Sequence, residues 1–411
     1  MKTKKMIFFL MTFLLLIIPL EAKNSPQISE ELVRDMIKTY GFCMSQQYTC
    51  DKIQELFPQY KKEVIEAQFK FYTQFGASIK KIDELFSESG DSWETMKKKS
   101  MDKIKSLSDF SNLSDSEIKE FISDVNKRAQ GNILSPVLET LLIFHPDYIR
   151  NPALEFRNEY TKKFNSEDHP KNKDIHFTVQ YPASWKSNEA DRPNIIKKFS
   201  SENGRGLENF SILIKHLPTT PNQKPSKTNI EELFQKSTVL KMLPKDIVIT
   251  SYSRTTIDSL PGAMVEYEEV QSRLKYNFFS KNLIFMTFYK NSVLAFSFSV
   301  GNVLVKKNDV LERYPFIKPL FILIANSIVI QDLWKHQHAV LEATINTSDK
   351  KDLQKSAENF ANNEEVKKLS LFSNIGGRMG LLLSFGEVAL KIFLVSVIFL
   401  GIKFILNKRR K

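Results

Sequence analysis

The chain has 411 residues, of which 42% are hydrophobic and 26% are charged. This composition excludes a disordered chain, and the length is sufficient for two ordinary domains with connecting segments. The net charge of +12 divides into +2 for residues 1–22, +6 for residues 376–411 and about +4 for the rest, where lysine and glutamate are interleaved. Because a mixed surface does not supply a basic stripe, we expect no nucleic-acid partner.

Residues 1–22 have the pattern of a signal peptide. Lys2, Lys4 and Lys5 precede an apolar run, and Ala22 supplies the small residue of a leader-type cleavage site. No cysteine follows the run, which excludes a lipoprotein leader. An uncleaved signal anchor is the alternative, but an apolar run of about 14 residues is short for a membrane span. We therefore expect the chain to be exported.

Residues 23–168 are predicted to form an all-α helical domain. Apolar residues recur at helical spacing from Ile28 to Tyr40, with Gly41 as the expected end of that helix, and again from Val64 to Phe86. Stripes of aromatic residues on helical faces are typical of a core, so we expect no ligand site in this domain.

Two later helix starts are predicted from capping residues. Ser114 and Glu117 have the spacing of a capping box, and Gly131 is the expected end of that helix. Ser135 and Pro136 supply a cap and a first-turn proline for a further short helix.

The only cysteines, Cys43 and Cys50, are seven residues apart. They could form a disulfide across a turn between two helices, act as a redox pair, or stay free. A redox pair usually has the spacing C-x-x-C, and a metal site would need more histidine or cysteine nearby. Because exported compartments are oxidising, we predict a structural disulfide between Cys43 and Cys50.

Beyond a polar linker at residues 167–174, the hydrophobic period changes to two, which indicates strands. Thr228 and Glu231 have the spacing of a capping box for an intervening helix, and a last helix is expected near residues 315–325. The strands follow one another without crossover helices, which favours an antiparallel sheet and an α+β fold. The predicted strands are residues 176–182, 195–199, 210–214, 247–257, 263–267, 274–289, 293–300 and 327–330.

The first of these strands carries the most informative motif. Phe177, Val179 and Tyr181 alternate with polar residues, which is the pattern of a half-buried strand. Pro182 ends it, because proline cannot donate to a strand ladder. Trp185 lies four residues beyond Tyr181, so it is expected to fold back over the end of the strand.

This motif, together with Leu260-Pro261-Gly262-Ala263, the strand at 293–299 and the closing helix and strand at 316–330, resembles the PsbP family over residues 174–332. That family includes the extrinsic photosystem II subunit and shares its fold with a Ran-binding nuclear import factor. The resemblance implies an α/β/α sandwich on an antiparallel sheet, used by relatives to bind proteins. It implies no catalytic residue. The flanking segments differ, so the photosynthetic and nuclear roles are not implied.

The C-terminal part is predicted to reach and cross a membrane. Residues 333–378 are expected to form a polar, partly helical stalk, residues 379–407 a single transmembrane helix, and residues 408–411 a basic cytoplasmic tail. His336 and His338 have no carboxylate or thiol companions, so we do not expect a metal site there.

A ladder of small residues overlaps the start of this predicted helix. Gly376, Gly380 and Ser384 form a small-xxx-small ladder that would allow weak homo-association of two helices.

The sequence has none of the usual catalytic motifs. It lacks G-x-S-x-G, H-E-x-x-H and a Walker loop, and Gly204-Arg205-Gly206 lacks the third glycine of a nucleotide loop. The pairs Ser78/Lys81 and Ser100/Lys103 match a Ser/Lys pattern, but a lysine-rich chain produces such pairs by chance. We therefore predict no catalytic, cofactor-binding or metal-binding residues, no cofactor, and no enzymatic activity.

The leading hypothesis is an exported, membrane-anchored interaction protein that binds a protein partner, with the bulk of the chain on the periplasmic or extracellular side. The alternative is a carrier or sensor of a small apolar ligand; an enzyme with an unrecognised site is the third. A carrier would need an apolar cavity of about 300 Å³ or more, whereas an interaction protein would expose an apolar patch.

Overall fold

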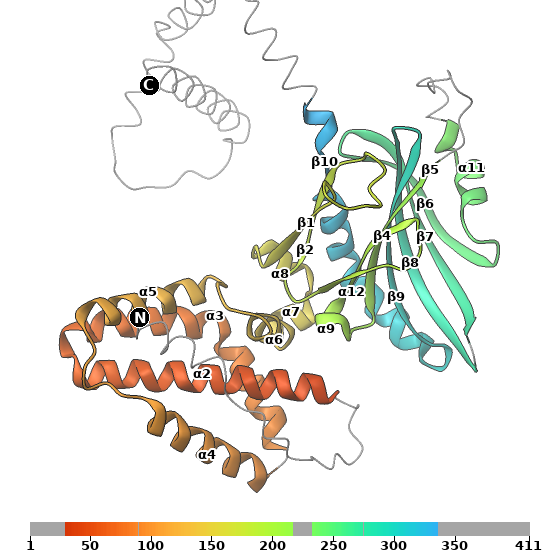
Figure 1. Cartoon of the computed structure of the whole chain (residues 1–411). Coiled ribbons are helices and arrows are strands. Elements are labelled where there is room, and N and C mark those ends of the chain that lie inside the picture. The colour runs from red at the N-terminus through yellow and green to blue at the C-terminus, as the bar shows by residue number, and fades with distance from the viewer. Residues whose placement is uncertain (1–28, 89, 217–231, 274, 336–411) are drawn as a thin grey trace, which may run out of the picture. The chain divides into compact units, whose positions relative to one another are not determined.

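The computed structural model describes residues 29–88, 90–216, 232–273 and 275–335 (Figure 1). These all belong to one compact unit that ends at Lys335. Within these ranges no helix is long and apolar enough to cross a membrane. The predicted signal peptide, transmembrane helix, basic tail, small-residue ladder and nearly all of the stalk lie outside the described residues, as do His336 and His338.

The first part of the unit is helical, and the part that follows is an antiparallel sheet domain, which confirms the predicted order of the two structural classes. The helices of the first part are α2 (Glu30–Leu56), the 3₁₀ turn η1 (Pro58–Tyr60), α3 (Lys61–Ser87), α4 (Asp91–Leu107), α5 (Asp115–Ala129), α6 (Val137–Ile143), α7 (Pro146–Arg150) and α8 (Ala153–Arg157).

Helix α2 does not end at Gly41, as the sequence predicted, but continues to Leu56. A glycine inside a helix costs about 1 kcal/mol relative to alanine. That cost is small beside the burial of the later turns, because Cys43, Cys50 and Ile53 lie on the buried face of the same helix. Local propensity was therefore overridden by packing.

The predicted capping box of α5 is confirmed: the Ser114 side chain accepts from the backbone N–H of Glu117, and the Glu117 carboxylate accepts from the backbone N–H of Ser114. The predicted cap of α6 is wrong by one residue, since Pro136 and not Ser135 occupies the N-cap position. The backbone N–H of Val137 donates to the carbonyl of Leu134 at 3.0 Å, so Ser135 and Pro136 form the middle of a turn that precedes the helix.

The sheet domain contains two antiparallel sheets. A three-stranded sheet has the order β1-β2-β10, with β1 at Thr161–Asn165, β2 at Phe177–Pro182 and β10 at Val329–Ile330. A seven-stranded sheet has the order β3-β4-β5-β9-β8-β7-β6. Its strands are β3 (Lys186–Glu189), β4 (Ile195–Ser200), β5 (Glu208–His216), β6 (Ile247–Ile257), β7 (Leu260–Arg273), β8 (Tyr276–Tyr289) and β9 (Ser292–Val303).

Strands β1 and β2 are placed differently from the sequence prediction. Strand β1 lies in the region predicted to be all-α, because Thr161 to Asn165 pair with β2 from Pro182 back to Thr178. Strand β2, which carries the Phe177 motif, belongs to the small sheet and not to the large one. Both differences arise from pairing between distant segments, which hydrophobic periodicity does not specify.

Helices cover both faces of the seven-stranded sheet. Helix α12 (Lys307–Asn326) packs on one face through Tyr314, Ile317 and Phe321, which share a core with Phe285 and with the small sheet. On the opposite face, Val239 of helix α11 (Lys236–Met242) packs against alternate strand residues that include Val265, Tyr267 and Ile284. The structure is therefore layered, with β6 and β3 at the two edges of the large sheet (Figure 1). The start of the helix predicted from Thr228 and Glu231 lies outside the described residues; its predicted inward residue Phe234 is described and is buried.

Candidate functional site

The predicted disulfide between Cys43 and Cys50 is wrong: both thiols are free and buried. Both residues lie on the continuous helix α2. Seven residues of helix separate their Cα atoms by about 10 Å, beyond the roughly 7 Å that a disulfide allows. Burial raises the pKa of each thiol to about 12. Both cysteines therefore pack in the interior, where the reactive thiolate form is disfavoured.

The Phe177 motif lies in the interior of the sheet domain. Phe177, Val179, Tyr181 and Trp185 all belong to the core that α12 and the small sheet share, and Pro182 is buried at the end of β2. The ring of Tyr181 lies 4.6 Å from that of Phe199. These residues determine how the small sheet packs, and none of them presents a reactive group to solvent.

The Ser/Lys pair at 78 and 81 is not assembled as a catalytic pair. The hydroxyl of Ser78 is buried in the helical region without a hydrogen-bond partner. Lys81 is half-buried, and its ammonium group lies 3.9 Å from the carboxylate of Glu84. Within the described residues there is also no group of three or more histidine, cysteine, aspartate or glutamate residues that could hold a metal ion.

Buried polar contacts join the helical region to the sheet domain. The carboxylate of Glu155 in α8 accepts hydrogen bonds from the backbone N–H and the hydroxyl of Ser184, both at 2.8 Å. Despite these bonds, burial raises the pKa of Glu155 to about 7. Arg313 of α12 donates to Glu208 at 2.7 Å and to the carbonyl of Ile149 in α7. Because each of these polar groups is hydrogen-bonded to another group of the chain, we interpret the contacts as structural and not as a binding site.

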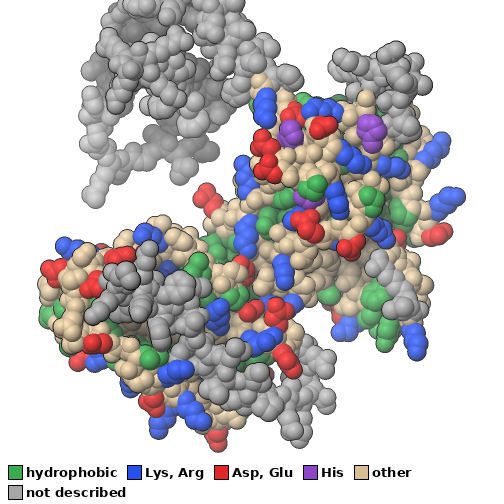
Figure 2. Space-filling model, in the orientation of Figure 1, with side chains coloured by type: hydrophobic (Ala, Val, Ile, Leu, Met, Phe, Trp, Pro, Cys, Tyr) green, Lys and Arg blue, Asp and Glu red, His purple; other side chains and the backbone are tan. Residues whose placement is uncertain are grey.

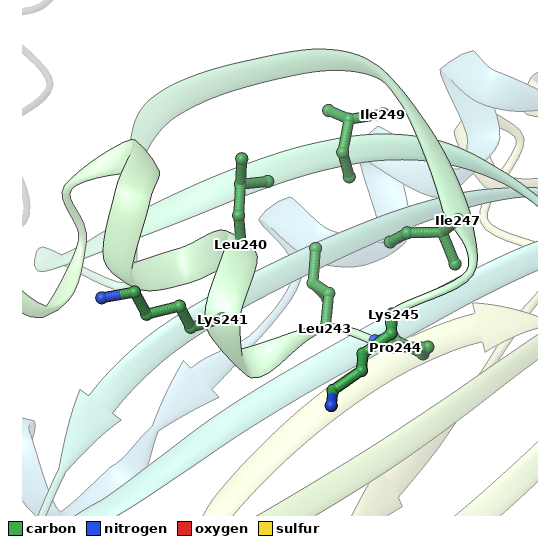
Figure 3. Close-up of a pocket in the computed structure, with 7 residues that line it drawn as sticks. All are labelled: Leu240, Lys241, Leu243, Pro244, Lys245, Ile247 and Ile249. Atoms are coloured by element: carbon green, nitrogen blue, oxygen red, sulfur yellow. The ribbon is translucent and has the colours of Figure 1, made fainter.

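An apolar hollow lies between α11 and the beginning of β6, with a volume of about 530 Å³ (Figure 3). We call it the α11–β6 hollow. In Figure 3 the side chains of Leu240 and Leu243 point toward the same gap as those of Ile247 and Ile249, whereas Lys241 and Lys245 extend away from it. The lining residues are Leu240, Lys241, Leu243, Pro244, Lys245, Ile247 and Ile249.

Exposed apolar side chains lie on both faces of the same end of the sheet. Val248 of β6 is 63% exposed and Tyr276 of β8 is 64% exposed. The strand register places Tyr276 and Phe278 on the same side of the sheet as the hollow, because Ile247 pairs with Glu269 and Phe278 pairs with Gln271, two residues further along β7. We call Met242, Tyr276 and Phe278, which are exposed on the α11 side of the sheet, the hairpin-end patch; Val248 and Val270 are exposed on the opposite face.

Strand β6 also forms an edge of the seven-stranded sheet. Among the described residues its only strand partner is β7. It has 11 residues, of which Arg254 alone is charged, and it contains no proline. The opposite edge strand, β3, has four residues, of which Lys186 and Glu189 are charged. Short, charged edges are protected against pairing with other chains, and β6 lacks both protections.

The apolar pattern of the sequence places Ile247 and Ile249 in a strand but does not identify this region as a site. The signal was the position of Leu240 and Leu243, which are apolar and directly precede a strand with few charges. Periodicity cannot show that these side chains leave a gap, because the gap depends on how α11 lies on the sheet.

Comparisons with known proteins give distant likenesses. No family model and no curated protein matches the chain. It is similar to the solved structure of PsbP from the cyanobacterium Synechocystis, with 15% identity, a TM-score of 0.26, and coverage of 42% of this chain and 92% of that one. It is also similar to the Ran-binding protein Mog1p of Saccharomyces cerevisiae, with 9% identity, a TM-score of 0.27, and coverage of 41% and 95%.

A third similar structure is LpqN of Mycobacterium tuberculosis, described as involved in cell envelope biogenesis, with 10% identity, a TM-score of 0.26, and coverage of 44% of this chain and 96% of that one. PsbP and the Ran-binding protein belong to the fold group that the sequence motifs resemble. These likenesses concern the fold alone and, at these TM-scores, carry no argument about function.

Proposed function

We propose that the chain is an exported, membrane-anchored, non-catalytic interaction protein whose sheet domain binds a protein partner at the membrane surface. Export and anchoring are supported by the sequence patterns at residues 1–22, 379–407 and 408–411, which lie outside the described residues.

The hairpin-end patch is the observation that carries the binding role. Single exposed apolar residues are normal on protein surfaces, whereas grouped ones mark interaction sites. Here Met242 of α11 and Tyr276 and Phe278 of β8 are exposed on the side of the sheet that carries the apolar hollow. Val248 of β6 and Val270 of β7 are exposed on the other face of the same end. In contrast, Figure 2 shows acidic and basic side chains interspersed over the face in view.

The chemistry of the α11–β6 hollow also favours binding over catalysis. Its seven lining residues provide aliphatic side chains and two ammonium groups, and none of them is a carboxylate, imidazole, thiol or hydroxyl. Such a lining can exclude water and hold an apolar group, but it does not bring an acid and a base together.

Photocrosslinking in native membranes tests this proposal. A benzophenone amino acid at Val248 or Tyr276 of the full-length chain should crosslink to one distinct protein. The same amino acid at Lys62, an exposed position on α3, is the matched control and should not crosslink to it. If Val248 and Tyr276 crosslinked only to lipid, or to the same mixture as Lys62, the protein-binding role would be wrong.

The volume of the hollow favours a second candidate function, the carriage of a small apolar ligand. About 530 Å³ lies within the range of small-molecule sites. Native mass spectrometry of the purified chain would then show a bound apolar molecule that is lost in Ile249→Asp. If the wild-type chain carried no added mass when purified in a mild detergent, this function would be excluded.

A further inference from the structure

We infer that the partner is held as an extended acidic peptide that adds a strand to the edge of β6. An apolar side chain of that peptide occupies the α11–β6 hollow, and a carboxylate lies beside Lys241 or Lys245. The inference rests on the proposed function and names the kind of partner and the way it is bound.

The backbone of β6 supplies the first part of the argument. In an antiparallel strand, successive backbone groups point alternately to the two sides, so about half of those in β6 point away from β7. An extended peptide can satisfy them by forming a further ladder, which gives affinity without regard to sequence. The length and low charge of β6, compared with β3, make it the accessible edge among the described strands.

The side chains of β6 supply specificity. Ile247 and Ile249 face α11, since they pack in the same core as Val239, whereas Val248 lies on the opposite face. Side chains of an added strand would alternate in the same way. Those on the α11 side would therefore meet the hollow, and those on the other side would meet Val248.

A register shift between β6 and β7 limits where the peptide can pair. The shift lies between Ile249 and Ser251 and divides the edge into a short segment beside the hollow and a longer one from Ser251 to Ile257. A bulge bends a strand and increases its twist. A peptide of about nine residues spans roughly 30 Å and can therefore pair with the longer segment and still reach the hollow.

Lys241 and Lys245, which line the hollow, favour a negatively charged partner. Lys241 and Lys245 are exposed and, among the described residues, neither forms an ion pair. Figure 3 shows both side chains extending outward from the apolar lining, where they can reach the carboxylates of a bound chain. Exposed ion pairs are individually weak, so they select the partner, while backbone pairing and the apolar anchor hold it.

Peptide binding to the purified full-length chain in detergent micelles tests the inference. The probe is a fluorescently labelled nine-residue peptide of alternating valine and threonine that ends in two aspartates, measured by anisotropy at low salt. A matched peptide ends in two lysines, and a third is the aspartate peptide with alternate backbone nitrogens methylated, which removes the donors that a strand ladder needs.

We expect the aspartate peptide to bind about fivefold more tightly than the lysine peptide, and the methylated peptide not to bind. The double substitution Lys241→Glu/Lys245→Glu should reverse the charge preference. Lys236→Glu, an exposed position on the same helix outside the hollow, should leave it unchanged. All three positions are exposed, so the variants are expected to fold.

Two results would overturn the inference: equal binding of the methylated peptide, or a charge preference that the double substitution does not change. Failure of the aspartate peptide to bind would overturn it as well. If photocrosslinking from Val248 still captured a protein in any of these cases, the proposed function would stand and only strand addition would be wrong. If peptides bound but no protein were crosslinked, the proposed function would fail.

Discussion

Asp35 of helix α2 and Arg205, which precedes β5, form an ion pair with 3.2 Å between Oδ2 and Nη1, although 170 residues separate them in the sequence. Both side chains are 15% exposed. The Nε and Nη2 atoms of the same guanidinium are buried without a hydrogen-bond partner. Burial also raises the pKa of Asp35 despite the pairing with Arg205. This pair therefore joins the helical region to the sheet domain at a considerable cost of desolvation.

A double-mutant cycle measures how strongly the two residues are coupled. Asp35→Ala should destabilise the protein by about 2 kcal/mol, because it leaves the whole guanidinium of Arg205 without a partner. The double variant Asp35→Ala/Arg205→Ala should be more stable than the sum of the single losses predicts. Denaturant unfolding of the four proteins gives the coupling energy, and strict additivity would show that the pair does not hold the two parts together.

Glu155 should make the protein less stable as the pH rises from about 4.5 to about 7. Its pKa in the folded state lies above the ordinary value of a glutamate. In this window the folded state therefore binds more protons than the unfolded state, and the free energy of unfolding falls as the pH rises. The loss is at most about 3 kcal/mol. Unfolding midpoints at pH 4.5 and pH 8 should differ less in Glu155→Gln than in the wild type. In Glu63→Gln, an exposed control, the difference should be unchanged, and an equal change in both variants would contradict the assignment.

The two cysteines should titrate as thiols only after unfolding. In the native protein a thiol reagent should react slowly with both, because burial raises the pKa of Cys43 and Cys50 to about 12 and excludes the reagent. In denaturant, protein purified without reductant should give two thiols per chain. If none appeared, the two residues would be bridged and helix α2 would have to be broken between them.

Replacing Trp185 by alanine should cost about 3–5 kcal/mol, because its side chain is almost wholly buried in the core beside β2. Asn188→Ala, at an exposed position of β3, should change the stability by about 0.5 kcal/mol or less. Thermal or denaturant midpoints of the two variants provide the comparison. Similar midpoints would show that Trp185 does not contribute to the core.

Membrane anchoring is tested by truncation. A chain of residues 1–375, with its leader, should be released in soluble form, whereas the full-length chain should remain in the membrane pellet after a carbonate wash. The reason is that the apolar run at 379–407 and the basic residues after it are absent from the shorter chain. Retention of the shorter chain in the pellet would point to an uncleaved leader or a second membrane contact.

The sequence predicts those structural features whose stabilising groups are close together in the chain. The capping box of Ser114 and Glu117 needs only a helix that begins between them, and it forms as predicted. The strands at β6 and β9 were likewise visible as alternating or continuous apolar runs. In such cases the stabilising groups lie within a few residues of one another.

Features that depend on contacts between segments distant in the sequence were determined only by the tertiary structure. Gly41 stays in a helix because later turns of α2 are buried, and the same helix keeps Cys43 and Cys50 apart. Thr161 is a strand residue because its segment pairs with β2. The candidate site follows the same rule. The sequence alone determined that Ile247 and Ile249 are apolar strand residues. Only the packing of α11 on the sheet left a hollow beside β6, which has one strand partner within the described part of the chain. A gap is a property of several surfaces together, so no single segment of the sequence specifies it.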